Sequence, residues 1–415
     1  IVPEDGPRPI PNLDKLSQTE VVDLLESTNG TLRDMASQWL IWNGDAKIIL
    51  PKLKSLLLKS SNTLARIHAL SVLDSHSTKS LTPGDLEQVL KSSDPLVVSH
   101  AVSVSEKFVN DHPQLGKLWL SLIEFDDPQL LMQLAYSLGE WESLLAGPAL
   151  GRLLVKAQGD PYLTAAAISS LNEINLSSAT KTILETEAAQ NLAIVTPLLK
   201  TALGLKQSQP ATKILLANAS LNNLGHWSQL LASVGNQRNM LESIAGEDEA
   251  LQSAIDDINQ RALDLAFDDS ADLDQRAIAI AYLGNSLGVD QRTIERLAEL
   301  IQPGSPLPLQ TAALEILSHR ADETVYEKLL ADWESLTPTL KTTLLSKLMQ
   351  RDTGLKLLLT AVKNNTVAAT EISPANQQRF LQHADESFRK QAENVFGQST
   401  SRAEVLTSLK GALTI

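Results

Sequence analysis

A repeat of about 33 residues, a length typical of solenoids, is the feature that most constrains this fold. Polar anchor residues recur just before apolar helical stretches, in steps of 33, 32, 33 and 33 along the numbering, at Asn29, Asn62, Asp94, Asp127 and Asp160. In a solenoid, short units of this kind stack and share one elongated core. Asn or Asp at this place predicts a helix N-cap, because its side chain accepts a hydrogen bond from free amides of the first turn.

The residues that follow each anchor predict a helix with one buried face. The third, seventh and eleventh positions are apolar or small: Leu32, Ala65, Val97, Leu130 and Leu163; Ala36, Ala69, Ala101, Leu134 and Ala167; Leu40, Leu73, Ser105, Leu138 and Leu171. These offsets share one stripe of a helix with 3.6 residues per turn. A capping box at Ser17 and Glu20 opens the preceding helix. We therefore predict an all-α fold, an α-solenoid (superhelix) of HEAT/armadillo-like helical hairpin repeats.

The repeat also predicts how the chain is organised. We expect an extended N-terminal segment over 1–12, regular HEAT-like repeats over 13–171, irregular helical hairpins over 172–268, and further HEAT-like repeats over 269–415. Anchors at Asp272 and Asp385 mark the last of these, and all four parts are expected to form one continuous solenoid. Gly-containing or Pro-containing stretches at 225–227 and 303–306 predict turns.

Composition excludes several classes of function. The formal net charge is −14 and no Lys/Arg block is longer than a pair, so the surface that neutralises nucleic-acid phosphates is missing. No apolar run of about 18 residues is present, which argues against membrane insertion. The chain has no cysteine, which rules out disulfides, thiolate metal sites and covalent haem attachment within it. We expect no cofactor in this chain.

The sequence offers little that points to catalysis. Gly-rich phosphate loops, His-Glu-x-x-His helices and Gly-x-Ser-x-Gly elbows are all missing. Ser178 and Lys181 form a Ser-x-x-Lys match, but without the companion motifs of acyl-transfer enzymes a helix cap is the better interpretation. We expect this chain not to be an enzyme. A HEAT-type lyase or glycosylase is a less favoured alternative, and a glycosylase would need a basic groove.

Six residues are candidates for an interaction surface. His68 and His100 both follow their anchors by six positions, with Gln133 next in the row. On helices about 8–10 Å apart the two imidazoles could share a metal or an acidic ligand, although half-buried structural histidines are more common. Trp42 and Trp141 lie at the ends of repeat helices and are candidates for exposed contacts. Arg66 shares the fourth position after the anchor with three other arginines, Arg33, Arg276 and Arg389. No catalytic, cofactor-binding or metal-binding residue is assigned.

Four stretches carry a family resemblance: 29–34, 64–70, 94–101 and 134–140. They resemble the HEAT-like middle region of the planctomycete-type membrane-bound dehydrogenases, which are large secreted proteins. In that family a β-propeller similar to sugar dehydrogenases precedes the repeats, and a c-type cytochrome domain with a Cys-x-x-Cys-His haem motif follows them. The two ends, 1–6 and 401–415, resemble the segments that leave the propeller and approach the cytochrome.

The resemblance implies a non-catalytic scaffold, a spacer between a propeller dehydrogenase-like domain and a c-type cytochrome domain in a bacterial redox protein. It implies a periplasmic or otherwise extracytoplasmic location, with haem c only in a C-terminal domain outside this chain. The start at Ile1, without an initiator Met or a signal peptide, is typical of a piece of a longer or processed protein. The alternative is a free-standing HEAT-repeat adaptor that binds a basic protein or peptide, which predicts salt-sensitive binding.

Overall fold

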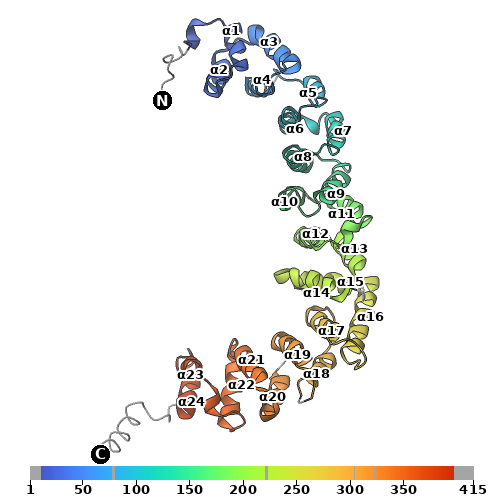
Figure 1. The fold of residues 1–415 in the computed structure, drawn as a ribbon, viewed down its shortest axis with the longest axis vertical. Helices are drawn as coiled ribbons and strands as arrows, with labels where there is room; N and C mark the ends of the chain where they lie inside the picture. The colour runs from blue at the N-terminus through green and yellow to red at the C-terminus, as the bar shows by residue number, and fades with distance from the viewer. Residues whose placement is uncertain (1–10, 77–79, 220–222, 303, 321–322, 397–415) are drawn as a thin grey trace, which may run out of the picture. The chain divides into compact units, whose positions relative to one another are not determined.

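The computed structural model describes residues 11–76, 80–219, 223–302, 304–320 and 323–396, and all of these are helix, turn or loop. They contain 24 α-helices and several short 3-10 turns, with no strand among them (Figure 1). The predicted all-α helical repeat fold is thereby confirmed. Two compact units divide the chain, at residues 1–217 and 218–415. Most of the predicted N-terminal segment, Pro303 and the end from 397 lie outside the described residues.

Unit 1 is built from helical hairpins packed in two rows (Figure 1). Each second helix packs against the second helix of the next hairpin, which gives the row α2, α4, α6, α8, α10 and α12. The hairpins are α1 (Gln18–Asp23) with α2 (Gly30–Asn43), α3 (Ala46–Lys59) with α4 (Thr63–His76), α5 (Pro83–Val89) with α6 (Pro95–Val109), α7 (Pro113–Leu122) with α8 (Pro128–Glu140), α9 (Ala146–Ala157) with α10 (Pro161–Ser169), and α11 (Leu176–Leu184) with α12 (Leu192–Gly204), followed by α13 (Ser208–Asn218).

All five predicted anchors of unit 1 cap the second helix of a hairpin. The side chain of each accepts hydrogen bonds from amides two or three residues later, for example from Leu130 N to Asp127 Oδ1 at 2.8 Å. The prolines that follow three of these anchors occupy the first helical position, where no amide is needed. The period in the sequence therefore marks where the second helix of each hairpin begins.

The predicted buried stripe is also present. Every residue at the third, seventh and eleventh positions of the five repeats is buried except Leu32, which is half-buried. Fully burying a Leu or Val side chain contributes about 1.5–3 kcal/mol relative to leaving it exposed. The mostly small seventh residue, as at Ala69 and Ala101, lets neighbouring second helices approach one another closely.

Polar contacts join successive hairpins at nearly the spacing of the repeat. Lys54 Nζ donates to Asp85 Oδ2 at 2.7 Å, and Thr63 Oγ1 donates to Asp94 Oδ2 at 2.5 Å; the two residues of each pair are 31 positions apart. The His76 ring contacts the Gly44 carbonyl oxygen at 2.8 Å across 32 positions. These contacts bond the first three hairpins of unit 1 to one another in order.

The period continues further than the sequence suggested. Asn191 caps α12 and Asn223 caps α14, which extends the series after Asp160 by two further steps of nearly the same length. The predicted turn at 225–227 is wrong, because these residues lie inside α14 (Leu224–Ser233). Gly225 sits in the first turn, where a glycine costs little, and burial of Trp227 favours the helix.

Unit 2 contains α14 and ten further helices among its described residues: α15 (Arg238–Glu247), α16 (Glu249–Ala266), α17 (Leu273–Asn285), α18 (Gln291–Ala298), α19 (Leu307–Arg320), α20 (Glu323–Ala331), α21 (Pro338–Leu348), α22 (Asp352–Lys363), α23 (Pro374–Leu381) and α24 (Glu386–Phe396). Helix α17 packs against α14, α16 and α19, so α15 and α16 are inserted in sequence between two neighbours of one row. The turn predicted at 303–306 is present at Gly304, whose φ is +104°.

Anchors in unit 2 are only partly those that the sequence predicts. Asp272 caps α17 as predicted, whereas Thr337 and Ser373 cap α21 and α23 without having been foreseen. Asp385 accepts hydrogen bonds from the first amides of α24, but only the short helix α23 separates it from the cap Ser373. Helix α24 packs against α22 and α23, whereas α17, which Asp272 caps, packs against α14 and α19. Asp385 therefore does not continue the series of caps to which Asp272 belongs.

Candidate protein-binding surface

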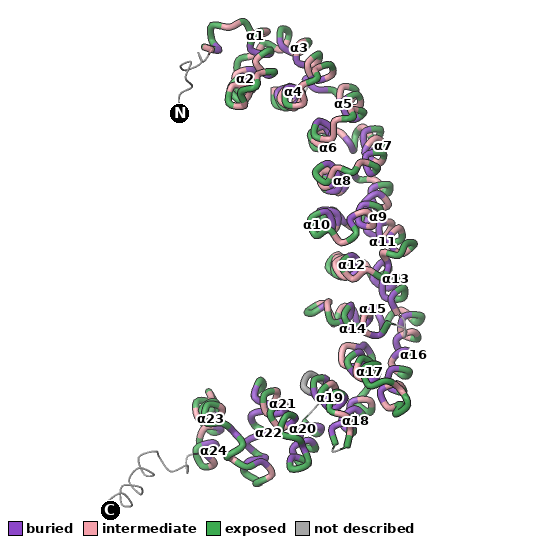
Figure 2. Tube along the Cα trace, viewed as in Figure 1, coloured by how far each residue is buried: buried purple, intermediate pink, exposed green. Residues whose placement is uncertain are grey.

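One side of the second helices of unit 1 is open to solvent. Positions two, six, nine and thirteen after each anchor lie away from the buried stripe, and we call the surface that they form on α2, α4, α6, α8 and α10 the second-helix face, in which only Ala166 is fully buried. Exposed and buried residues lie on different sides of these helices (Figure 2). Six large hydrophobic residues are exposed on this face: Met35, Trp42, Leu64, Leu96, Tyr136 and Tyr162.

Exposed aromatic rings are concentrated on the second-helix face. Among the described residues only three Trp, Tyr or Phe side chains are exposed: Trp42 at 72%, Tyr136 at 47% and Tyr162 at 76%. They belong to α2, α8 and α10 respectively. Leaving a large ring in water gives up most of the stabilisation that its burial would provide. Three such rings make this face a candidate for contact with another molecule.

Charged side chains are missing from positions two, six and nine of this face, whereas position thirteen carries Lys107 and Glu140. Positions two, six and nine of the five helices are Thr31, Met35, Gln38, Leu64, His68, Ser71, Leu96, His100, Ser103, Gln129, Gln133, Tyr136, Tyr162, Ala166 and Ser169. In a chain whose charged residues make up 20%, this is a local depletion. Depletion of charge together with enrichment in aromatic residues and Met is typical of the core of protein–protein interfaces.

His68 lies on the second-helix face, where its surroundings disfavour protonation of the imidazole. Its Nδ1 lies 3.0 Å from Ser37 Oγ, and its Nε2 lies 3.9 Å from Asp34 Oδ1. Partial burial lowers the pKa of His68, and the nearby charge of Arg33 lowers it further, while Asp34 opposes them. The charge of His100 is a smaller cause that also lowers the pKa of His68. No cluster of three or more metal-ligating side chains occurs in the described parts of the chain.

Ser37, His68 and Asp34 follow one another in the order of a hydrolase triad, but the arrangement does not support acyl transfer. Ser37 Oγ also lies 2.9 Å from the carbonyl oxygen of Arg33, one helical turn earlier. Ser37 sits in the middle of α2, where backbone amides are already bonded within the helix. An acyl-transfer site needs free amide donors directed at the developing oxyanion. This serine therefore has a positioning role for His68.

Gln133 connects two helices of the face. Its Nε2 donates to Glu106 Oε1 at 3.2 Å and to Ser137 Oγ at 3.1 Å. Ser137 Oγ in turn donates to Glu106 Oε1 at 2.5 Å. The network joins α6 to α8 and fixes the Gln133 amide at the edge of the exposed surface. A partner would meet a positioned amide here.

The guanidinium of Arg66 forms hydrogen bonds with groups of its own repeat and the next. Its Nε donates to the Leu57 carbonyl near the end of α3, and Nη1 donates to Ser92 Oγ in the next loop, at 2.9 and 3.1 Å. The other arginines of the row also bond to carbonyls at or after the end of the preceding helix. A cation is favourable at a helix C-terminus because of the free carbonyls and the helix dipole. The arginine row holds the two helices of a hairpin together.

Trp141 is not exposed, and its prediction as a surface contact is wrong. The ring is 3% exposed and makes an edge contact with Trp119, with ring centroids 6.3 Å apart. It packs over Gly116, where an added Cβ would lie only 2.3 Å from the indole. The missing side chain of Gly116 creates the space that the indole fills.

The Ser-x-x-Lys match is not the helix cap that the sequence predicted. Ser178 and Lys181 lie inside α11, and Ser178 Oγ donates to the Asn175 carbonyl at 3.0 Å.

Comparisons with known proteins identify no relative by sequence. No protein-family model and no curated protein matches the chain. Solved structures match at low similarity. An engineered protein is 16% identical over 92% of this chain and 98% of its own, with a TM-score of 0.31. A chain in a homology model of the AP-3 complex is 12% identical over 95% and 78%, with a TM-score of 0.40. A chain from work on the cadherin–beta-catenin interaction is 14% identical over 92% and 98%, with a TM-score of 0.25.

Among the residues that the structure describes, no helix has both the length and the apolar character needed to cross a membrane.

Proposed function

We propose that this chain is a non-catalytic scaffold that binds a protein partner on the second-helix face of unit 1. The observation that carries the proposal is that Trp42, Tyr136 and Tyr162, the exposed aromatic residues of the described chain, all lie on one face, whose positions two, six and nine carry no formal charge. Tryptophan and tyrosine dominate the energetics of many interfaces, because they bury a large area with little loss of side-chain freedom.

The geometry of the face suits a partner segment that crosses several helices. Neighbouring packed helices lie about 8–10 Å apart, and an extended chain rises about 3.3 Å per residue. About every third residue of an extended segment would therefore meet the next second helix. Between the rings the face offers neutral hydrogen-bonding groups, including the amides of Gln129 and Gln133 and the imidazole of His100. These groups can bind a backbone without requiring a charge on the partner.

The family resemblance supports a more specific proposal for the partner. In it the chain is a spacer in an extracytoplasmic redox protein, and the second-helix face holds a propeller dehydrogenase-like domain or a c-type cytochrome domain. Haem c then belongs to the cytochrome domain. The alternative proposal, a free-standing adaptor for a basic segment, is supported by the net charge of −14. A denaturing gel of source-cell extract, probed with an antibody to this chain and stained for haem, distinguishes them. The spacer gives a haem-stained band much larger than 45.0 kDa, and the adaptor gives a haem-free band near that mass.

Site-specific photocrosslinking tests the binding face itself. A benzophenone amino acid is placed at Tyr136, at Tyr162 or, as a matched control, at Ile48, which is 46% exposed but lies on α3 in the first-helix row. We expect positions 136 and 162 to form adducts with a single partner segment, identified by mass spectrometry. Trp42→Ala should reduce the yield at Tyr136. Equal yields from all three positions, or adducts with many unrelated segments, would contradict the proposal.

A further inference from the structure

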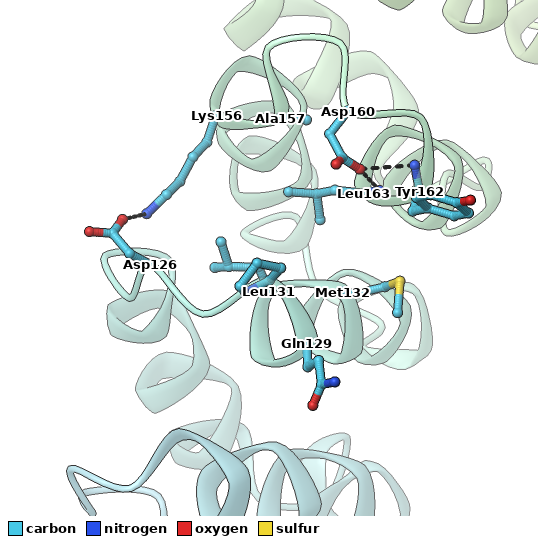
Figure 3. A pocket seen from close by; sticks show the side chains of 10 residues that line it. Asp126, Gln129, Leu131, Met132, Lys156, Ala157, Asp160, Tyr162 and Leu163 are labelled. Carbon is cyan, nitrogen blue, oxygen red and sulfur yellow. Dashed lines mark hydrogen bonds and ion pairs between the residues drawn. The ribbon is translucent and has the colours of Figure 1, made fainter.

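A pocket lies between the starts of α8 and α10 in unit 1 (Figure 3). Its volume is about 430 Å³, within the range of about 300–1,000 Å³ that is usual for ligand pockets. Leu131 and Leu163 are buried in its wall, whereas the Tyr162 ring is 76% exposed, so the pocket opens to solvent beside the ring. Met132 also lines it, and its thioether is a favourable neighbour for an aromatic ring.

The gap between α4 and α6 is bridged by polar side chains that α8 lacks, as α6 also does at Pro95 and Val98. Between α4 and α6, Thr63 Oγ1 donates to the cap Asp94, and Arg66 Nη1 reaches Ser92 Oγ at 3.1 Å. Both side chains cross from one repeat to the next loop. The first and fourth positions after the anchor of α8 are instead Pro128 and Leu131, which carry no polar group that could bridge to the loop of Asp160.

The charges around the pocket favour a cation at its edge. Asp126 is 95% exposed and lies 3.0 Å from Lys156 Nζ. Lys156 Nζ also donates to the carbonyls of Ile123 and Phe125 at 3.0 and 2.6 Å, so its charge is directed at the backbone of unit 1. Asp160 contributes a second carboxylate while capping α10. The lining therefore carries one lysine and two aspartates, with an exposed carboxylate at the rim.

We propose that this pocket binds a bulky apolar side chain, preferably aromatic, from a partner segment in which a neighbouring Lys or Arg pairs with Asp126. The inference rests on the proposed protein-binding function and names the chemistry of the segment that docks. Tyr162 supplies an exposed ring for edge or offset stacking, and Leu131 and Leu163 supply the apolar wall. The segment continues from the pocket onto the second-helix face, to which Tyr162 also belongs.

Methionine methyl NMR gives a direct test, because the chain has only four methionines. Met132 lines the pocket, Met35 lies on the second-helix face at α2, and Met240 and Met349 lie in unit 2. The full chain, labelled with ¹³C at the methionine methyl groups, is titrated with the blocked dipeptides N-acetyl-Phe-Arg-amide, N-acetyl-Phe-Glu-amide and N-acetyl-Ala-Arg-amide. We expect Phe-Arg to shift Met132 in a saturable way, Phe-Glu to bind about two- to fivefold more weakly because the rim pair is exposed, and Ala-Arg to produce no saturable shift.

Three variants sharpen the test. Leu131→Arg gives α8 the residue that spans the corresponding gap from α4, and it should abolish the Met132 response. Because this change alters a buried position, Asp126→Asn serves as a second variant on an exposed side chain. It should remove the preference of Phe-Arg over Phe-Glu and retain binding of both. Asp34→Asn, on a carboxylate that is 75% exposed near the second-helix face at α2, is the matched control and should change neither.

The outcomes separate this inference from the proposed function. If Met132 does not respond to either Phe dipeptide, or if all four methionines shift in parallel, the pocket assignment is overturned. If it fails while crosslinking from Tyr136 still identifies one partner segment, the binding scaffold stands without this pocket. If Met132 responds selectively while crosslinking fails, the pocket is real and the protein-binding proposal is wrong.

Discussion

The two units are both built from packed helices, but the spacing of their helix caps is regular in unit 1 and irregular in unit 2. In unit 1 the anchors from Asn29 to Asn191 follow one another in nearly equal steps, and each begins a second helix. In unit 2 the step from Asn223 to Asp272 is about half as long again, because α15 and α16 are inserted between these two caps. Stacked hairpins contact mainly their neighbours, so an added helix pair is tolerated without disturbing distant repeats. Constant spacing makes a repeat readable in sequence, but it is not required for the fold.

The largest expected difference concerns two buried tryptophans. Trp141→Ala in unit 1 and Trp333→Ala in unit 2 each remove a buried indole, at a cost of about 3–5 kcal/mol. Trp333 Nε1 also donates to Glu371 at 2.7 Å, so that change additionally removes a donor from this carboxylate. Hydrogen exchange measured by mass spectrometry should increase around α7 to α9 in the first variant and around η6 (Trp333–Ser335) and α21 in the second.

Trp42→Ala, at a 72% exposed position, is the control and should leave exchange unchanged. If units 1 and 2 are independent folding units, each core variant should affect exchange in its own unit. A uniform increase across residues 11–396 in either variant would show that the two units unfold together and that the comparison between them has no energetic counterpart.

A smaller effect tests whether a cap matters equally in both units. Asp127→Ala removes a cap that the sequence period reveals, and Thr337→Ala removes one that it does not. Each side chain accepts a bond from an amide three residues later, so each change should cost about 1 kcal/mol in urea denaturation. Asp127→Asn and Thr337→Ser should restore most of that loss. A negligible cost at Thr337 alone would mean that unit 2 relies less on capping than unit 1.

The smallest expected effect is a pH dependence from one histidine in each unit. Burial lowers the pKa of His68 in unit 1 and of His226 in unit 2, so the folded state favours the neutral imidazole. Their contribution to stability is complete above the unfolded pKa of about 6.5, and it declines as the pH falls through that value toward the lower folded pKa. Comparing melting temperatures at about pH 7.5 and about pH 5.5, we expect a smaller decrease in His68→Gln and in His226→Gln than in the natural chain. An unchanged decrease in both variants would exclude this origin.

Much of unit 1 could be predicted from sequence, because the caps of its second helices are all Asn or Asp and its core stripe keeps one phase. Thr337 and Ser373 were missed because Ser and Thr residues are also common outside helix starts, and because these two caps do not keep the spacing of the repeat. Trp141 was misplaced for a different reason. Its burial depends on Gly116, which lies on α7, the other helix of the same hairpin, and a helical offset along α8 does not reveal a gap on α7.

The candidate surface was predicted only in part. Trp42, His68, His100 and Gln133 were selected, and all four lie at the sixth or thirteenth position on the second-helix face. Tyr136 and Tyr162 were not selected, although they lie at the ninth and second positions, which the same offsets assign to the side opposite the core. The pocket beside Tyr162 is lined by residues of α8, α9, α10 and their loops, and only the arrangement of neighbouring repeats shows it.

The polar contacts between residues about one repeat apart also bear on how such a chain changes length during evolution. Lys54 and Asp85, or Thr63 and Asp94, join one hairpin only to the next, and the cap and stripe positions recur at nearly the same offsets. A duplication or deletion of one hairpin-sized block would therefore create a junction between surfaces that already fit related neighbours. Length can then vary by whole hairpins, and each added hairpin would extend the second-helix face by one helix.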